Sequence, residues 1–336
     1  MKVSELGEFG LIRLLAETVN RSRNPKDSSW QNLIIGVGDD AAAWKVQGAV
    51  QLATTDSLIE ETHFDLKLVT WEELGWRAIA VNLSDIAAMG GIPQYALVSL
   101  SLPGELDVDS VLSLYRGMLK IATRFGIAIV GGNIAAADKT TINVTVLGNL
   151  ESAAMLTRSA AVSGDLIAVT GYPGLSAAGL QMLKRHLKFD PETTQLLREA
   201  HLTPMPRIDE GQILLHRAVK CAIDVSDGLI ADLSHICESS GVSARINQKM
   251  LPIHPALKKN FNTDYLQYVL GGGEDYELLF TASTLIMPRL KKTMPCPITV
   301  IGEIIEGQPG QVELTGDGGK TIPWEKTGWE HFKSRL

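Results

Sequence analysis

Residues 219–237 read VKCAIDVSDGLIADLSHIC, and this stretch decides the fold class of the chain. Its first part, through Val225, is an apolar run that predicts a buried strand, and the part from Gly228 onward predicts a helix. The strand delivers two acids and a hydroxyl at its carboxyl end, namely Asp224, Ser226 and Asp227. That position is the usual ligand edge of an α/β sheet, although Asp227 is also a good N-cap for the helix. The stretch therefore predicts an α/β fold with a ligand site at this turn.

Four other short acidic motifs occur where we expect a strand or turn to lead into the next element. They are Gly38-Asp39-Asp40-Ala41-Ala42, Thr54-Thr55-Asp56, Asn82-Leu83-Ser84-Asp85 and Gly272-Gly273-Glu274-Asp275-Tyr276. Each one alone is also explained by an ordinary turn or an exposed helix face. Carboxylates that converge repel one another, and their pKa values rise unless cations lie between them. Magnesium suits such oxygen ligands and usually arrives with substrate phosphates, so the motifs together predict an enzyme that binds a metal and a nucleotide.

Two weaker signals accompany these motifs. Gly131-Gly132-Asn133 ends a predicted strand, and paired glycines let a phosphate approach the backbone, although a bare turn explains them as well. His63 follows the second motif, and a lone histidine is more often structural than ligating. Gly319-Lys320-Thr321 does not complete a P-loop, because Leu314 stands where the first glycine is required. The sequence offers no obvious catalytic base or nucleophile, which favours phosphoryl transfer, where positioning and charge neutralisation do most of the work.

The size and composition narrow the class of protein. A chain of 336 residues favours two domains, and we expect residues 1–150 and residues 151–336 to form them. The net charge of -7, with no basic stripe, argues against a nucleic-acid partner. No apolar run approaches the ~20 residues that span a bilayer, so we expect no membrane partner. The three cysteines form no paired spacing and the N-terminus has no signal-peptide pattern, so we expect a cytoplasmic protein.

Hydrophobic periodicity predicts the elements of both halves. The expected strands are 33–37, 50–56, 95–102, 127–130, 141–147, 165–171, 219–225, 276–281 and 298–305. The expected helices are 5–19, 71–89, 108–125, 175–187 and 228–237, whereas residues 188–210 are polar and contain three prolines. Strands and helices that alternate in this way indicate an α/β architecture in each half.

The motifs resemble those of the thiamine-monophosphate kinase family, in the superfamily of aminoimidazole-ribonucleotide synthetase and selenophosphate synthetase. The resemblance runs nearly end to end. The matching segments are GVGDDAA (36–42), TTDSLIEETHF (54–64), AVNLSDIAAMGGIP (80–93), LTRSAAVSGD (156–165), HLTPMPRIDEG (201–211), DVSDGLIADLSHI (224–236) and GGGEDYELLF (271–280). Thr62-His63-Phe64 and Gly273-Glu274-Asp275-Tyr276 fit the kinase and fit aminoimidazole-ribonucleotide synthetase badly.

This resemblance implies a two-domain α/β enzyme that is a homodimer, in which the N-terminal domains join their sheets into a β-barrel and ATP binds between the two domains. The implied reaction converts ATP and thiamine monophosphate to ADP and thiamine diphosphate, the last step of thiamine diphosphate biosynthesis. The implied magnesium ligands are Asp40, Thr54, Thr55, Asp56, Asp85, Asn133, Asp224 and Asp227. The implied contacts to ATP are Gly132, Asn133, Arg158 and Ser226, and those to thiamine monophosphate are His63, Glu274 and Trp329.

Elementary chemistry agrees with these implied roles. A cationic thiazolium suits the Glu274 carboxylate and the face of Trp329. Because donor and acceptor are both phosphates, several magnesium ions would offset their repulsion, and direct in-line transfer needs no protein nucleophile. Arg158 is the one basic residue of the set that can hold a phosphate through two N–H groups.

One position departs from the family pattern. The family usually has Asp after the double glycine, where this chain has Asn133. An amide oxygen can ligate magnesium without contributing charge, so we predict weaker magnesium affinity there and retained activity. Two alternatives to the kinase stay open: a non-catalytic nucleotide-binding relative, and another synthetase of the superfamily such as aminoimidazole-ribonucleotide synthetase.

Overall fold

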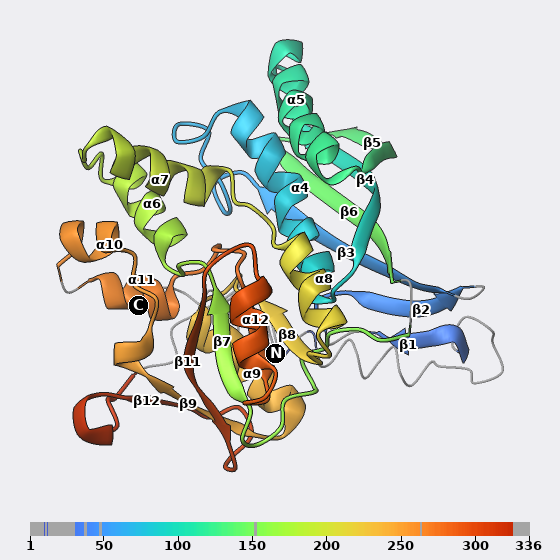
Figure 1. The fold of residues 1–336 in the computed structure, drawn as a ribbon. Coiled ribbons are helices and arrows are strands. Elements are labelled where there is room, and N and C mark those ends of the chain that lie inside the picture. Colours follow the sequence, from blue (N-terminus) through green and yellow to red (C-terminus); the bar gives the residue numbers. More distant parts are fainter. Residues whose placement is uncertain are drawn as a thin grey trace.

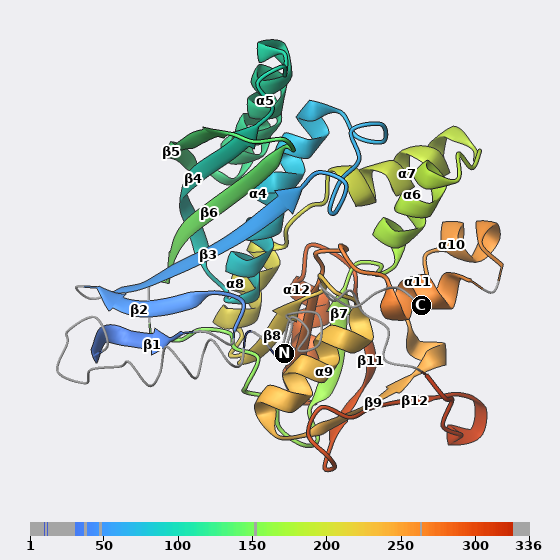
Figure 2. The ribbon, with the colours of Figure 1, turned by 180° about the vertical axis from the view of Figure 1, so that it is seen from behind.

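The computed structural model describes residues 10, 12, 31–36, 39–46, 49–150, 153–262 and 264–324. Within these residues the chain forms two six-stranded sheets with helices packed on them (Figures 1 and 2), as the predicted two-part α/β architecture requires. Nearly all of the helix expected at residues 5–19 lies outside the described residues. Among the described helices, none combines the length and the apolar composition that crossing a bilayer demands.

The first sheet has the strand order β1-β2-β3-β6-β4-β5. Its strands are β1 (Leu33–Ile35), β2 (Ala42–Val46), β3 (Ala49–Ile59), β4 (Ile92–Leu102), β5 (Ala128–Ala136) and β6 (Thr141–Leu150). Neighbours pair antiparallel, except that β4 and β5 are parallel. Alternate side chains of β6 are buried, which is the period of two that places one face of a strand on a core. The helices α4 (Trp71–Ala88) and α5 (Val108–Phe125) pack on one face of this sheet, which Figures 1 and 2 show from opposite sides.

β5 is the edge strand of the first sheet and pairs with β4 alone among the described strands. Nearly every side chain along β5 is exposed, including Val130 and Ile134. Tyr95 and Leu97 of the neighbouring β4 are also exposed. An exposed apolar strand edge is a template for pairing with another chain. Within the described residues, the sheet of a single chain is thus open at this edge and does not close into a barrel.

The second sheet has the strand order β12-β9-β11-β7-β10-β8. Its strands are β7 (Leu166–Thr170), β8 (Cys221–Asp224), β9 (Ser243–Asn247), β10 (Leu278–Ala282), β11 (Ile298–Ile305) and β12 (Val312–Thr315). The accompanying helices are α6 (Leu175–Lys184), α7 (Pro191–Leu202), α8 (Ile208–His216), α9 (Leu229–Ser240), α10 (Pro255–Asn260), α11 (Tyr265–Gly271) and α12 (Met287–Thr293), with 3-10 turns η1 (Gln248–Met250) and η2 (Asp317–Gly319). The pairs are antiparallel apart from β12 with β9. Asp224 therefore ends an edge strand of a mixed sheet, not a central strand of a parallel one.

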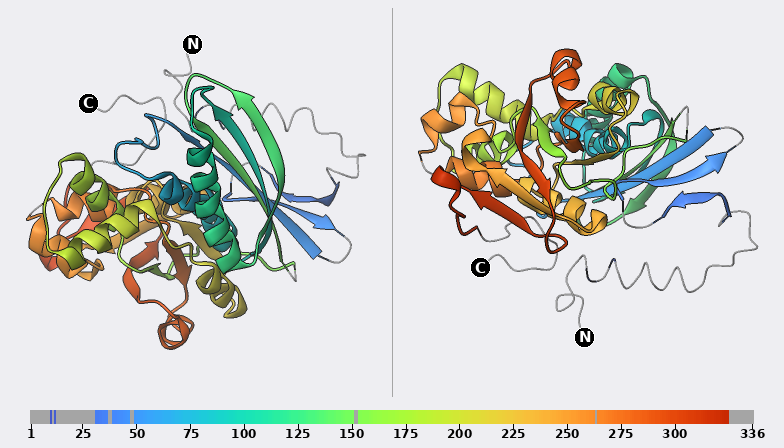
Figure 3. Two further views of the ribbon diagram at one scale, coloured as in Figure 1. Left: turned by 90° about the horizontal axis from the view of Figure 1, so that it is seen from above. Right: turned by 60° about the horizontal axis from the view of Figure 1, so that its bottom comes forward.

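Helix α4 connects the two sheets. A capping box starts it, because Thr70 accepts a hydrogen bond from the Glu73 amide and Glu73 accepts one from the Thr70 amide. The helix contacts β3 and β6 on one side and β8 and α8 on the other. Both views of Figure 3 show it between the two parts of the molecule. Side chains that leave α4 in different directions can therefore reach either half.

One hydrophobic core extends through both halves of the chain. It contains Leu52 and Val144 of the first sheet, Leu83 of α4, and Ala222 and Phe280 of the second sheet. Each of these five side chains is almost completely buried. Because burial of apolar surface is the dominant favourable term in folding, the two halves stabilise each other. The domain boundary expected near residue 150 stays a prediction.

Most predicted elements are confirmed, with shifted ends. The strand expected at 219–225 is β8, and the helix expected at 228–237 is α9, which extends to Ser240. The polar residues 188–210 contain α7 and the start of α8, neither of which was predicted. Asp190 caps α7 by accepting from the Thr193 amide, and Pro191 occupies the first turn, where its missing N–H costs nothing. This proline starts a helix instead of breaking one.

Candidate active site

A cavity of about 1510 Å³ lies between the two halves of the chain. It is lined by eleven of the predicted site residues: Asp40, Thr54, Thr55, Asp56, His63, Asp85, Arg158, Asp224, Ser226, Asp227 and Glu274. These residues come from the turn before β2, from β3 and the loop after it, from α4, from the loop between β6 and β7, from β8 and the turn after it, and from the turn before β10. The fold thus brings together motifs that are scattered along the sequence.

Three carboxylates from different elements meet in this cavity, and we refer to Asp40, Asp85 and Asp224 as the carboxylate cluster. One oxygen of each lies within 4.8 Å of the others. Asp85 projects from α4 and Asp224 ends β8, which packs against that helix. Ser84 donates a hydrogen bond to Asp224 Oδ2 at 2.7 Å, so a hydroxyl from the first half orients a carboxylate of the second.

Residues 54–56 of β3 divide between two roles. The Thr54 hydroxyl donates to Asp85 Oδ2, and Asp56 also interacts with the Asp85 side chain. Thr55 points its hydroxyl elsewhere and donates to the Val144 carbonyl at 3.1 Å. This is the alternation of a strand, in which residues two apart share a face. Of the three predicted ligands on β3, Thr54 and Asp56 are therefore the ones that the structure joins to the carboxylate cluster.

The carboxylate cluster carries more negative charge than its surroundings offset. Burial, followed by repulsion from Asp56 and Asp224, raises the pKa of Asp85 well above its ordinary value. Burial and then repulsion from Asp40 raise the pKa of Asp224 in the same way. Arg158 is the cation in contact, and it donates to Asp40 through Nε at 3.2 Å and Nη2 at 2.6 Å. Hard oxygen ligands that repel one another, with Arg158 as the contacting guanidinium, suit a divalent cation such as magnesium.

The side chain of Asp232, in α9, forms hydrogen bonds with the backbone of the turn that carries Ser226 and Asp227. Asp232 Oδ2 accepts hydrogen bonds from three consecutive amides, those of Ser226 at 3.2 Å, Asp227 at 3.2 Å and Gly228 at 3.0 Å. Gly228 has a φ of 131°, a conformation that glycine adopts far more readily than other residues. The carboxylate thus fixes the turn that follows β8. The sequence signal for this contact is an acid one helical turn after Gly228, but Asp232 was not predicted as a site residue.

A second set of charges lines the same cavity, and we refer to Arg77, His201 and Glu274 as the Arg77 group. Arg77 of α4 forms an ion pair with Glu274 Oε1, and His201 Nδ1 of α7 lies 3.7 Å from Glu274 Oε2. Burial, followed by repulsion from Arg77, lowers the pKa of His201 well below its ordinary value. We therefore treat His201 as neutral near pH 7, and its contact with Glu274 as polar and not as an ion pair. His63 lies elsewhere in the cavity wall, where its Nδ1 accepts from the Ile59 amide at 3.1 Å.

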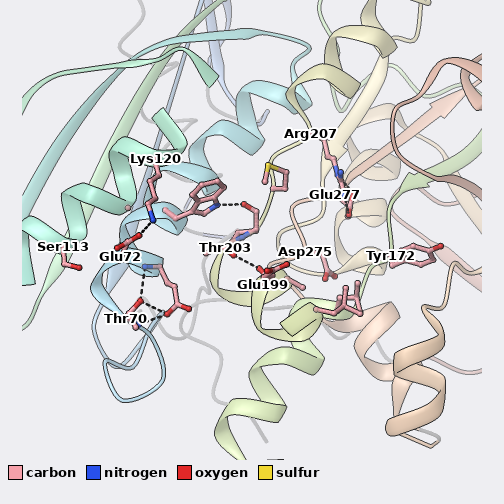
Figure 4. Close-up of a pocket in the computed structure, with 18 residues that line it drawn as sticks. Thr70, Glu72, Ser113, Lys120, Tyr172, Glu199, Thr203, Arg207, Asp275 and Glu277 are labelled. Carbon is pink, nitrogen blue, oxygen red and sulfur yellow. Dashed lines mark hydrogen bonds and ion pairs between the residues drawn. The ribbon is translucent and has the colours of Figure 1, made fainter. Parts of the chain in front are cut away.

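The segment that carries Glu274 separates this cavity from a second one of about 850 Å³, which Figure 4 shows. Glu274 and Tyr276 line the first cavity, whereas Asp275 and Glu277 line the second. Asp275 accepts from the amides that start α6, those of Gly174 at 2.6 Å and Ser176 at 3.1 Å. Glu277 accepts from Arg207 through two N–H groups, at 2.6 Å and 2.5 Å. Alternate carboxylates thus anchor the segment on both sides.

Three predicted site residues are not placed in the cavity. Gly132 and Asn133 lie on the exposed strand β5, where they pair with Val98 and Ser99 of β4. A Cβ added to Gly132 would lie 1.7 Å from the Val98 carbonyl oxygen, so the packing of these two strands itself requires glycine. Trp329 lies outside the described residues. The roles assigned to these three residues stay predictions.

Arg77 and His201 were not predicted as site residues from the sequence. A charged residue in the otherwise apolar stretch of α4 was a usable signal, because an unpaired charge is costly to bury. His201 carried no such signal, because it falls in the stretch that was read as polar and rich in proline. Their partner Glu274 is far from both in sequence, and 197 positions separate it from Arg77.

Comparison with known proteins agrees with this architecture. Residues 38–150 match the model of the AIR synthase related protein N-terminal domain, and residues 162–315 match that of its C-terminal domain. Thiamine-monophosphate kinase of Bacillus subtilis (strain 168) is 37% identical over 335 residues, which cover 98% of this chain and 100% of that protein. The enzyme of the same name from Aquifex aeolicus (strain VF5) is 36% identical over 336 residues, 99% of this chain and 100% of that protein.

A solved structure, AaThiL complexed with AMPPCP and TMP, superimposes with a TM-score of 0.84. It is 35% identical to this chain, and the match covers 98% of this chain and 99% of the other. Sequence and fold thus agree over nearly the full length, and the chain belongs to the thiamine-monophosphate kinase family.

Proposed function

We propose that this chain transfers the γ-phosphoryl group of ATP to thiamine monophosphate and produces thiamine diphosphate and ADP. The observation that carries the proposal is that the carboxylate cluster and the Arg77 group line the same cavity. The first suits cations that accompany phosphates, and the second offers a fixed acceptor to an organic ring. The substrates named in the AaThiL complex, AMPPCP and TMP, support the assignment.

Magnesium is the cofactor that the carboxylate cluster fits. Asp40, Asp85 and Asp224 offer oxygen ligands that lie close together, whereas Asp227 belongs to a separate group with Asp232 and His235. When bound there, magnesium supplies the positive charge that offsets repulsion between the two phosphate substrates. The contribution of the chain is to hold these carboxylates in place through Ser84, Thr54 and Asp232, so that no reorganisation is needed during transfer.

Arg158 has a two-part role in this proposal. Its guanidinium donates two hydrogen bonds to Asp40, one from Nε and one from Nη2. A phosphate can take both of these donors only when Asp40 releases them. Binding of a cation by Asp40 would favour that release, because the carboxylate then has another positive partner. Arg158 would thus pass from Asp40 to ATP as the metal and the nucleotide bind.

We also propose that the enzyme is a homodimer that pairs through the open edge of the first sheet. The exposed apolar side chains of β4 and β5 support this, since Tyr95 is 47%, Val130 56% and Ile134 70% exposed. Gly132 and Asn133 lie on the same strand and outside the cavity of their own chain. A contact with nucleotide made across the dimer would reconcile that position with the role implied by the family. The free cysteines agree with a reducing compartment such as the cytoplasm.

Product formation from purified protein tests the proposed reaction. The chain is incubated with ATP, magnesium and thiamine monophosphate, and thiamine diphosphate is quantified by chromatography. Unphosphorylated thiamine and the precursor of aminoimidazole ribonucleotide serve as the alternative substrates. We expect thiamine diphosphate only from the monophosphate. Turnover of the aminoimidazole precursor would instead identify a synthetase, and tight ATP binding without any product would identify a non-catalytic relative.

A further inference from the structure

Arg77 is a charged side chain in the interior of the molecule. It is 1% exposed and is the largest of the fully buried side chains among the described residues. A buried ion pair rarely adds stability over apolar residues of similar volume, so a structural explanation alone is weak. Arg77 also lines the cavity that holds the carboxylate cluster. Its position points to a role in the chemistry of that cavity.

The contacts of Arg77 converge on the segment that carries Glu274. Its Nη2 donates to Glu274 Oε1, and its guanidinium also interacts with the Tyr276 side chain. The Nε of Arg77 is buried and has no hydrogen-bond partner among the described residues. Arg77 thus forms its ion pair with one oxygen of Glu274, and its Nε is a donor without a partner among the described residues.

The backbone around Glu274 is strained. Glu274 has a φ of 64° and Tyr276 a φ of 52°, which are conformations that such residues seldom adopt. Strain of this kind persists only where the surroundings fix the chain, and it concentrates at functional sites. The amides of Glu274 and Tyr276 donate to the carbonyls of Ser226 at 2.7 Å and Val225 at 2.9 Å. Asp275 and Glu277 anchor the other side of the segment in the second cavity (Figure 4).

The second oxygen of Glu274 is left in a different environment. It lies 3.7 Å from His201 Nδ1, which is within 3.1 Å of the Ser176 hydroxyl. His201 is 5% exposed, so a positive charge on it would be costly. Among the described residues, Arg77 is therefore the cation that pairs with the Glu274 carboxylate, and Glu274 Oε2 faces the neutral His201 ring.

We infer that Arg77 is a positioning residue that holds Glu274 by one oxygen, so that the other oxygen accepts a hydrogen bond from an exocyclic amine of a planar heterocyclic substrate. This inference rests on the proposed function, whose substrate carries an aminopyrimidine. It also changes the role expected for Glu274. A carboxylate already neutralised by a buried guanidinium recognises a donor by geometry and serves poorly as the counter-ion of a thiazolium.

Four variants test the inference: Arg77→Met, Arg77→Lys, Glu274→Gln and the double variant Arg77→Met with Glu274→Gln. The KM for thiamine monophosphate and the KM for ATP are measured separately, with magnesium saturating. Arg77→Met should raise the KM for thiamine monophosphate about tenfold or more and leave the KM for ATP within about twofold. Arg77→Lys, which keeps the charge, should recover part of the loss. If Arg77 acts through Glu274, Arg77→Met should change little when Glu274→Gln is already present.

Arg207→Met is the matched control. Arg207 also pairs with a carboxylate of the same segment, but it does so in the second cavity and through two hydrogen bonds to Glu277. It should lower the unfolding temperature and leave the KM for thiamine monophosphate nearly unchanged. An equal rise in that KM for Arg77→Met and Arg207→Met would reduce Arg77 to a structural residue and overturn the inference. Should Arg77→Met fail to fold, Arg77→Lys and Glu274→Gln carry the same comparison.

A substrate analogue tests the hydrogen bond itself. Replacement of the exocyclic amine of thiamine monophosphate by oxygen removes the donor that Glu274 is inferred to bind. The native enzyme should prefer the natural substrate by about tenfold or more in kcat/KM, and Arg77→Met should lose most of that preference. Equal preference in both proteins would refute the inference. Failure of the native enzyme to form any thiamine diphosphate would refute the proposed function instead, so the two failures are distinct.

Discussion

In the carboxylate cluster three acids meet one guanidinium, Arg158, whereas in the Arg77 group a single carboxylate meets a guanidinium of its own. Both groups line one cavity, in which the Asp40 side chain is fully buried and the Glu274 side chain is 31% exposed. The cluster keeps an excess of negative charge, and burial with repulsion from neighbouring carboxylates raises the pKa values of Asp85 and Asp224. The Arg77 group is balanced within the protein.

The comparison teaches that one cavity can recognise ligands in two ways. A cluster of carboxylates whose negative charge is not neutralised by the protein selects ligands by charge, because a bound cation removes the repulsion between the carboxylates. A compensated pair selects by geometry, because its net charge is small and its atoms are fixed. The following predictions test whether this division holds.

The largest expected effect comes from Asp85→Asn, which removes charge from the cluster and keeps the shape of the side chain. We expect kcat to fall by roughly 10³-fold, since the site loses a metal ligand. Without magnesium, the same variant should unfold at a higher temperature than the native protein, by about 2–4 °C, because repulsion is relieved. Steady-state kinetics and thermal unfolding measure the two effects.

Asp209→Asn is the control for this variant, because Asp209 is exposed and lies outside the cavity. It should change neither quantity. A loss of stability in Asp85→Asn would show that the cluster is not repulsive, and the contrast with the Arg77 group would then fail.

The second effect concerns magnesium, pH and stability. Burial and then repulsion from Asp40 raise the pKa of Asp39 to about 6, and the pKa values of Asp85 and Asp224 are also raised. A carboxyl group with a raised pKa favours the folded state below its unfolded value, and this advantage is lost as pH rises through the folded value. Without magnesium, the unfolding temperature should therefore fall from about pH 4 through pH 6 and above. Magnesium should reverse this fall, so its stabilising effect should grow with pH.

Calorimetry with and without magnesium, at matched ionic strength, measures this growth. Sodium chloride at the same ionic strength is the control, because screening alone should act weakly on buried charges. If magnesium raised the unfolding temperature by the same amount at every pH, magnesium would not bind at the carboxylate cluster.

The third effect concerns Arg158, the cation that contacts the cluster within the described part of the chain. Arg158→Lys keeps the charge and loses the two-donor fork that now holds Asp40. We expect the KM for ATP to rise about tenfold, with a smaller change in the KM for thiamine monophosphate. Arg198→Lys is the matched control, since Arg198 makes a similar fork with Glu73 outside this cavity. Equal effects of the two variants on ATP would remove Arg158 from the nucleotide site.

The smallest effect is expected at Asn133, which lies outside the cavity of its own chain. Asn133→Asp should lower the magnesium concentration needed for half-maximal activity, by about threefold, because a charged ligand replaces an amide. Asn262→Asp places the same charge on an exposed loop and should have no such effect. An unchanged magnesium requirement in Asn133→Asp would show that this position does not contribute to the metal site.

The sequence was sufficient to predict the carboxylate cluster because its members sit in recognisable local patterns. Asp224 follows an apolar run and Asp85 interrupts an apolar helix, so each can be identified from its immediate neighbours. The Arg77 group could not be predicted in this way. Arg77 and Glu274 are 197 positions apart in the sequence, and a contact over that separation is decided by the tertiary fold. The helix α7, which carries His201, was missed because a proline in its first turn looks like a breaker.

The order and direction of the strands in the second sheet could not be predicted from local sequence patterns either. Alternating strands and helices are typical of parallel sheets, yet β8, β10, β7, β11 and β9 run antiparallel in turn. Long-range pairing decides this arrangement, because the connections are long enough to permit either direction.

The continuous core described above also determines how the chain comes apart. Ala222 and Phe280 share their packing with Leu52 and Val144 across α4, so neither half can lose its structure without exposing apolar surface of the other. A heat-capacity trace should therefore show one cooperative transition and not two. The same coupling means that a fragment ending at residue 150 would expose to water the apolar surface that packs against Ala222 and Phe280 in the whole chain.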